Sequence, residues 1–77
     1  MKELVEFIVK SMVDNPNQVV VNEIEEFSAT ILELSVAQSD MGRVIGKGGR
    51  VINSIRSIVQ VAAAKQGRRV SLEIIED

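Results

Sequence analysis

The chain has 77 residues, of which 45% are hydrophobic and 26% charged, and it contains neither cysteine nor histidine. This length allows one small domain, residues 1–77, and the apolar content argues against disorder. Without cysteine there is no disulfide or thiolate metal site. Without histidine the commonest general base and metal ligand is missing. We therefore expect no metal, no cofactor and no enzyme.

The charged residues are unevenly distributed along the chain. Residues 1–40 hold two lysines against eight acidic side chains, a net charge of −6. Residues 41–77 hold seven basic against three acidic side chains, a net charge of +4, and the two halves together give the −2 of the whole chain. A basic surface can therefore exist on an acidic protein. The alternative is that two solvated faces differ by chance.

The N-terminal segment has the apolar spacing of an amphipathic helix. Leu4, Ile8 and Met12 recur at intervals of four, which predicts a helix over residues 2–13. The DNP sequence at residues 14–16 ends it, because proline lacks an N–H and restricts the preceding residue. The segment lacks the apolar core of a signal peptide, and no apolar run in the sequence is long enough to cross a bilayer. We expect a soluble, cytoplasmic protein.

Two β-strands are predicted in the next part of the chain. The β-branched segment QVVVNEI predicts a strand over residues 18–24. After a turn at EEFSA, the segment TILELSVA predicts a second strand over residues 30–37, because its leucines alternate with polar residues. Such a strand has one face for the core and one face for solvent.

Two helices, separated by a glycine-rich stretch, are predicted next. Ser39 or Asp40 caps a short helix that runs to about Ile45. After the GKGG sequence, apolar residues at helical spacing predict a longer helix that ends near Lys65. Gly67 then stops this helix, because glycine adopts the backbone conformation that commonly follows a helix C-terminus.

The last segment, RRVSLEII, predicts a third strand with Val70, Leu72 and Ile74 directed inward. The element order is therefore α-β-β-α-α-β. The connection between the second and third strands is long enough for a parallel crossover. We expect an α+β domain in which a three-stranded mixed sheet carries helices on one face.

The stretch GRVIGKGGRVI, residues 42–52, places four glycines between the two predicted helices. Glycine lets a phosphate approach the backbone, and the N-terminus of the following helix offers free N–H groups. Lys47 and Arg50 add positive charge. These features indicate an anion-binding turn. A tight turn between helices without a ligand, as in helix-turn-helix proteins, is the alternative.

Two nucleotide-binding loops are excluded by spacing and context. A P-loop needs Ser or Thr where this chain has Gly48, and glycine where it has Met41. The dinucleotide fingerprint needs a preceding strand and a larger fold, whereas these glycines follow a predicted helix in a short chain.

The segment VIGKGGRVI matches the KH-domain core V-I-G-x-x-G-x-x-I at every fixed position, and the predicted element order is that of the bacterial, type II KH domain. With DNP, LELSVAQSDMGRVIGKGGR, IRSIVQVAAAKQGRRVSLEI and the single-domain length, the chain resembles the KhpA (YlqC) family of small bacterial KH proteins over nearly its whole length. Gly48 departs from the larger polar residue expected in that family, which concerns the stiffness of the loop rather than binding.

The resemblance implies binding of single-stranded RNA, with the G-x-x-G loop clamping the backbone of about four nucleotides. Glycine and isoleucine of the short helix would line the groove, and flanking arginines would contact phosphates or base edges. The implied RNA-binding residues are Gly42, Arg43, Ile45, Gly46, Lys47, Gly48, Gly49 and Arg50. Ile52 and Ile55 are assigned to the core. Arg69 is either part of the far groove wall or a solvated charge on an edge strand.

The family also implies self-association, or pairing with a larger Jag-type KH protein. On the long helix, Val51, Ile52, Ile55, Val59 and Ala62 are expected to face the sheet. A stripe at i, i+4, i+7 and i+11 turns away from them and is a candidate dimer face: Ser54, Ile58, Val61 and Lys65. The alternative is an ordinary exposed valine.

Two functions from different classes follow from these patterns and the resemblance. The first is a single-stranded RNA-binding protein, a post-transcriptional regulator or RNA chaperone-like adaptor. The second is a protein-interaction module that acts mainly through homo- or heterodimerisation. Catalysis is not expected, because Glu23, Glu25 and Glu26 lie in or beside a predicted turn and are interpreted as solvated charge.

Overall fold

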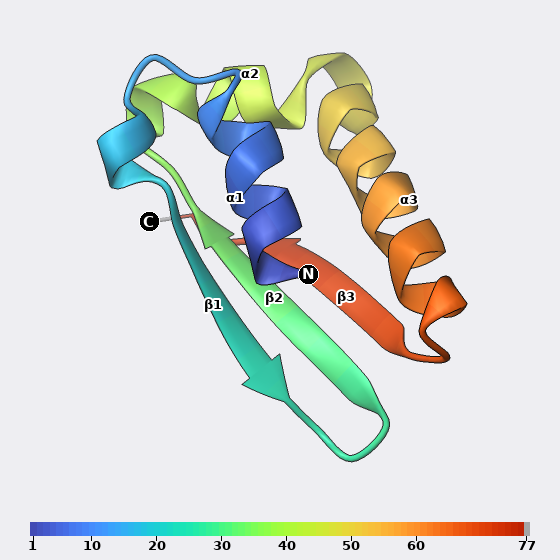
Figure 1. The fold of residues 1–77 in the computed structure, drawn as a ribbon. Coiled ribbons are helices and arrows are strands. Elements are labelled where there is room, and N and C mark those ends of the chain that lie inside the picture. The colour runs from blue at the N-terminus through green and yellow to red at the C-terminus, as the bar shows by residue number, and fades with distance from the viewer. Residues whose placement is uncertain (77) are drawn as a thin grey trace.

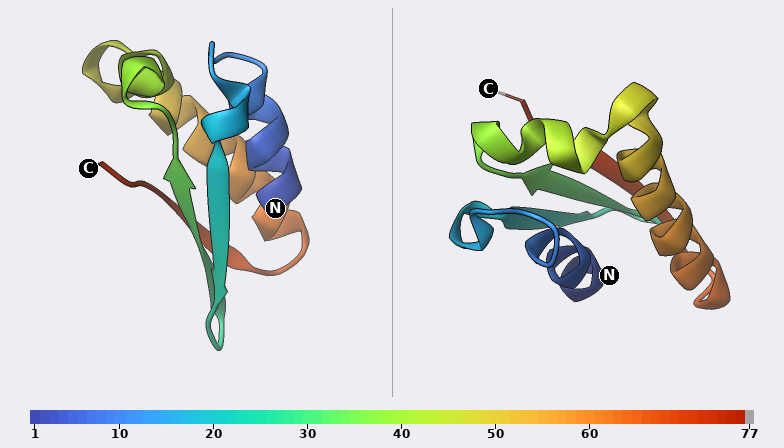
Figure 2. Two further views of the ribbon diagram at one scale, coloured as in Figure 1. Left: turned by 90° about the vertical axis from the view of Figure 1, so that its left-hand side faces the viewer. Right: turned by 90° about the horizontal axis from the view of Figure 1, so that it is seen from above.

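Three strands form one mixed sheet, and two long helices cover one of its faces (Figure 1). The computed structural model describes residues 1–76. Its helices and strands are α1 (Lys2–Lys10), β1 (Val20–Glu25), β2 (Ala29–Ser35), α2 (Met41–Ile45), α3 (Arg50–Lys65) and β3 (Arg69–Ile74). The predicted order and the α+β class are confirmed. Helices α1 and α3 lie against the sheet, and the short α2 lies at its end (Figure 2).

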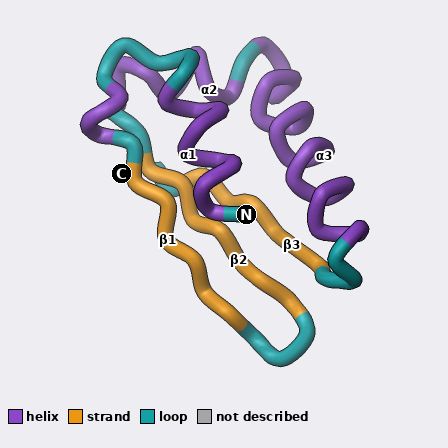
Figure 3. The backbone as a smooth tube through the Cα atoms, in the orientation of Figure 1, coloured by secondary structure: helices purple, strands orange, loops and turns teal. Residues whose placement is uncertain are grey.

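The sheet has the strand order β1-β2-β3, with β2 in the centre (Figure 3). Strands β1 and β2 pair as an antiparallel hairpin, in which Val20 is opposite Ser35. Strands β2 and β3 pair in parallel, with Ala29 opposite Arg69. The predicted parallel crossover is therefore confirmed, and it consists of α2, the glycine loop and α3.

The core lies between the helical layer and the sheet. Val5 and Val9 of α1, Ile55 and Val59 of α3, and Leu32 of β2 are all buried. Each such side chain contributes about 1.5–3 kcal/mol when it is removed from water. The set of α3 residues that are buried in this core differs slightly from the predicted set.

Ala63, rather than Ala62, completes the buried row of α3. Residues spaced by four along a helix lie on one face, and Ile55, Val59 and Ala63 have this spacing. Ala62 and Val51 are only half-buried.

The predicted element boundaries need correction at several ends. Helix α1 ends at Lys10 rather than at residue 13, because the N–H of Met12 donates to Val9 at 3.1 Å in a tightened last turn. A 3₁₀ turn over Pro16–Gln18 occupies the start of the first predicted strand, so β1 begins later.

Strands β2 and β3 also differ from the predictions 30–37 and 68–75 by one or two residues, which is the ordinary uncertainty of such boundaries.

The C-terminus of α3 is closed as predicted by Gly67, whose φ is +69°. The N–H of Gly67 donates to the carbonyl of Ala64 at 3.0 Å, and the N–H of Arg68 donates to that of Ala63 at 3.0 Å. This pair of hydrogen bonds satisfies the last carbonyls of the helix. It also turns the chain directly into β3.

Candidate nucleic-acid interface

A buried carboxylate joins the start of α2 to the segment that follows α1. Asp40 is only 2% exposed. It accepts hydrogen bonds from the backbone N–H groups of Asp14 and Asn15, at 3.1 and 3.0 Å, and from the side-chain amide of Asn15 at 3.0 Å. Of the two predicted caps, Ser39 and Asp40, it is Asp40 that occupies the N-cap position of α2, but its side chain makes no capping hydrogen bond there.

The same hydrogen bonds set the ionisation of this group. Burial alone raises the pKa of Asp40. This effect is outweighed by the hydrogen bonds that the carboxylate accepts from the side chain and backbone of Asn15 and from the backbone of Asp14. The positive charge of Arg43 lowers the pKa further. The pKa of Asp40 therefore lies below its usual value of 3.8. The ionised form is the one that fixes α2 in place.

The glycine loop between α2 and α3 is a tight turn with left-handed backbone. Gly46 has a φ of +75°, and the N–H of Gly49 donates to its carbonyl at 3.1 Å. A Cβ at Gly46 would lie 2.5 Å from Cγ2 of Val51, so only glycine fits there. A Cβ at Gly48 would meet nothing within 4 Å, so this position faces open space.

The predicted binding residues lie along one continuous segment from α2 into α3. Lys47 and Arg50 are exposed, and neither forms an ion pair within residues 1–76. Arg43 is directed toward the segment that follows α1, where it pairs with Asp14 at 3.3 Å. An exposed pair of this kind is worth at most about 1 kcal/mol, so a phosphate can compete with it.

The two uncharged predicted residues of α2 differ in their surroundings. A Cβ on Gly42 would meet nothing within 4 Å, so the helix surface is open there. Ile45 is half-buried and packs against the core. Ile52 and Ile55 are buried, as predicted.

A polar flank of α3, which the sequence interpretation missed, lies beside the free edge of β3. The Nε of Arg56 donates to the carbonyl of Leu72 at 2.9 Å, and its Nη1 donates to Oδ1 of Asn53 at 2.9 Å. Within the described residues 1–76, strand β3 pairs with β2 alone, and the N–H of Ile75 donates to Leu34. Backbone groups alternate in direction along a strand, so those of Leu72 point to the free edge.

This flank, together with the free edge of β3, forms a polar surface that follows the glycine loop along α3. It continues to a hollow of about 330 Å³ lined by Gln60, Arg68, Arg69, Val70 and Ser71. The exposed Arg69 thus lies at the far end of the same side of the molecule. The spacing of Asn53, Arg56 and Gln60 at i, i+3 and i+7 is the sequence signal that could have identified the flank.

The predicted dimer stripe lies on the outward side of α3. Ile58 is 51% exposed and Val61 is 60% exposed. Ser54 and Lys65 are exposed as well. The stripe is thus separate from the flank that carries Arg56.

Residues 1–76 offer neither a metal centre nor a membrane-spanning helix. No group of three or more Asp and Glu side chains in this part of the chain is arranged to hold a metal ion. Within the same residues, no helix has the length and apolar character to span a bilayer.

The fold and the loop together define a type II KH domain, and comparisons with known proteins agree. A family model described as "KhpA/KhpB, KH domain" matches residues 2–74. Relatives named "RNA-binding protein KhpA" include that of Borreliella burgdorferi, 53% identical over 96% of this chain and 90% of its own, and that of Clostridium perfringens, 53% identical over 97% and 100%. The chain therefore belongs to the KhpA/KhpB KH-domain family. No solved structure matches it.

The low pKa of Asp40 predicts how stability depends on pH. A carboxyl group whose pKa is lower in the folded chain stabilises the fold above its unfolded pKa, and this contribution is lost as the pH falls through the folded value. We expect Asp40→Asn to lower the melting temperature at pH 7, because its amide NH₂ would face at least one of the three N–H donors that the two carboxylate oxygens now accept from. The difference from the wild type should shrink below about pH 4.

Circular dichroism melting curves from pH 7 to pH 3 would measure this effect. Glu23→Gln, an exposed carboxylate on β1, is the matched control and should leave the melting temperature unchanged. A constant difference between the wild type and Asp40→Asn over the whole range would contradict the role of the ionised carboxylate.

Proposed function

We propose that the chain binds single-stranded RNA, with the Gly46–Gly49 loop clamping the phosphate backbone, and that it acts as a post-transcriptional regulator or RNA chaperone-like adaptor in the cytoplasm. The observation that carries this proposal is the loop itself, where open glycine backbone lies beside Lys47 and Arg50 at the start of α3. The RNA-binding function that the relatives' names state supports it.

The chemistry of the surrounding surface fits this ligand. Phosphates are held by cations and by backbone N–H groups at a helix N-terminus, both of which the loop supplies. Bases would lie between α2 and the free edge of β3, where Arg56 and Arg69 offer N–H donors. Only two aromatic residues occur in the chain, so base stacking on aromatic platforms contributes little.

A second function is favoured by one observation, the exposed apolar stripe of α3. Ile58 and Val61 are directed to solvent although both are large and apolar. We propose that this stripe pairs with a second copy of the chain, or with a larger Jag-type KH protein. In the alternative function this pairing, rather than RNA binding, would be the main activity.

Reversing the charge of the glycine loop tests whether the loop binds phosphate. In the double variant Lys47→Asp with Gly48→Asp, two carboxylates replace one cation, and each costs about 1 kcal/mol near a phosphate in water. We expect affinity for RNA to fall about tenfold or more. Aspartate tolerates left-handed backbone, so the loop should still form. Fluorescence anisotropy with a labelled single-stranded RNA measures the change.

The control for this variant is Lys47→Asn with Gly48→Asn, which has nearly the same shape without the negative charges. It should bind more weakly than the wild type and more tightly than the aspartate variant. If the aspartate variant is folded by circular dichroism and binds as the wild type does, the loop is not the phosphate site.

The small number of cations near the loop predicts a modest salt dependence. Three to four phosphate contacts give a slope of log affinity against log salt of roughly −2 to −3, at about −0.7 per contact for single strands. Anisotropy titrations at several salt concentrations measure this slope. A slope near zero, or one several-fold steeper, would contradict a footprint of three to four phosphates.

A charged substitution on the outward face of α3 tests whether the stripe forms the dimer interface. At a two-fold axis Val61→Glu would place two carboxylates close together, and we expect it to give monomers with an intact fold. Gln60→Glu, on the flank facing β3, adds the same charge and should leave the dimer unchanged. Light scattering at several concentrations is the measurement, and a wild type that is monomeric throughout would rule out this interface.

A further inference from the structure

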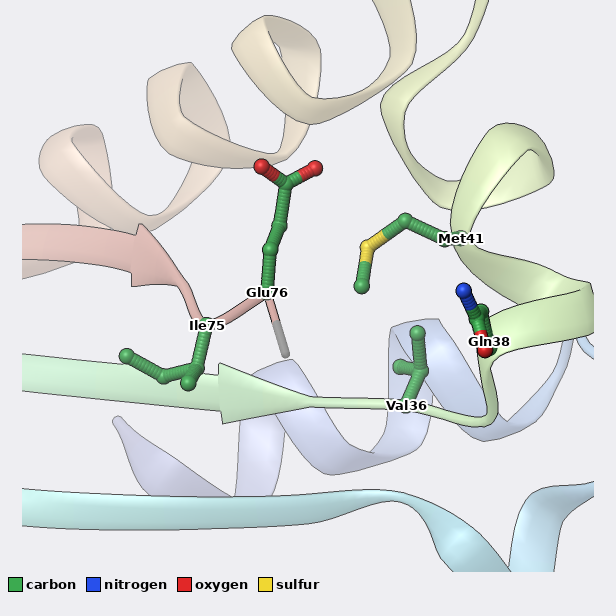
Figure 4. A pocket seen from close by; sticks show the side chains of 5 residues that line it. All are labelled: Val36, Gln38, Met41, Ile75 and Glu76. Carbon is green, nitrogen blue, oxygen red and sulfur yellow. The ribbon is translucent and has the colours of Figure 1, made fainter.

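A hollow of about 270 Å³ lies beside α2 on the side of the segment that follows β3 (Figure 4). It is lined by Val36 and Gln38 from the chain before α2, by Met41 at the start of α2, and by Ile75 and Glu76 after β3. Figure 4 shows the side chains of Met41 and Glu76 on facing sides of this space. None of these residues belongs to the glycine loop or to the flank of α3.

The hollow is within reach of an RNA strand that is held by the loop. Helix α2 has five residues, and its rise of about 1.5 Å per residue separates Met41 from Gly46 by roughly 7 Å along the axis. A nucleotide next to the one bound at the loop could therefore reach this end of α2.

The walls and polar groups of the hollow suit one flat heterocycle. Val36, Met41 and Ile75 supply apolar surface, and the volume is below the roughly 300–1,000 Å³ of pockets for drug-sized ligands. The carboxylate of Glu76 can only accept hydrogen bonds. The amide of Gln38 can donate as well as accept.

We propose that this hollow takes a guanine base of the bound RNA, an inference that rests on the proposed function. Guanine is the RNA base with two adjacent N–H donors, at N1 and N2, which match the two oxygens of the Glu76 carboxylate. Gln38 also lines the hollow, so its amide is a further polar group that the base could meet. Adenine and cytosine each offer one amino group beside an acceptor ring nitrogen, and uracil offers one N–H between two carbonyl oxygens, so each would also place an acceptor against the carboxylate.

Matched oligonucleotides test this specificity. The probe is a short labelled oligouridine with its central residue replaced by guanosine, inosine or adenosine, measured by fluorescence anisotropy. A bidentate contact is worth at least about 1 kcal/mol of discrimination, so the wild type should bind the guanosine probe about fivefold or more tightly than the adenosine probe. Inosine lacks the N2 amino group and should fall between them.

Two variants that each remove one negative charge distinguish recognition of guanine by Glu76 from simple repulsion of the RNA phosphates. Glu76→Gln should abolish the preference for guanosine, because one of its two terminal groups is then a donor. Glu73→Gln is the control, since Glu73 is exposed on the opposite face of β3 from the buried Leu72, and it should keep the preference.

Each remaining outcome overturns the inference. If Glu76→Gln tightens binding to every probe by the same factor, the carboxylate only repels phosphate. If the wild type binds all probes equally and the loop variant abolishes binding, the guanine site is wrong while RNA binding stands. If the wild type binds none of them, the proposed function fails together with the inference.

Discussion

The parallel pairing of β2 with β3 is the constraint on which the candidate site depends. Parallel neighbours cannot be joined by a short turn, so the chain must leave β2, cross the helical face and return. This crossover contains α2, the glycine loop and α3, and the turn between its two helices lies at the end of the sheet. The loop is therefore exposed, while the residues that follow it in α3 enter the core.

Two local constraints then fix the loop within this crossover. Gly46 adopts a φ of +75° directly against Val51, where any side chain would collide, so the turn can pass closely under the start of α3. On the other side, the carboxylate of Asp40 joins α2 to the segment after α1. The first constraint is steric and local, whereas the second is electrostatic and connects residues about 25 positions apart.

Sequence reasoning succeeded where the signal is local and failed where it is not. The 3.6-residue spacing of α3, the alternation of β2 and the glycine after α3 are properties of neighbouring residues, and each was predicted. The position of Asp40 just before α2 predicts a helix cap. Its hydrogen-bond partners, however, are Asp14 and Asn15, which follow α1 and are distant in the sequence. Arg56 was missed for the same reason: its hydrogen bond to Leu72 exists only after β3 has returned beside α3. The roles of the loop residues came from the motif and the family resemblance rather than from geometry.

Helix α3 presents three separate surfaces, and their separation would let a KH domain combine RNA binding with pairing. Its inner face, with Ile55 and Val59, belongs to the core, and the flank with Arg56 faces β3. Ile58 and Val61 remain on the outward side, so pairing through them would leave the proposed groove uncovered. A single groove with few cations gives limited affinity, whereas two linked grooves raise it through effective concentration. Assembly and RNA binding on opposite sides of one helix would therefore reinforce each other rather than compete.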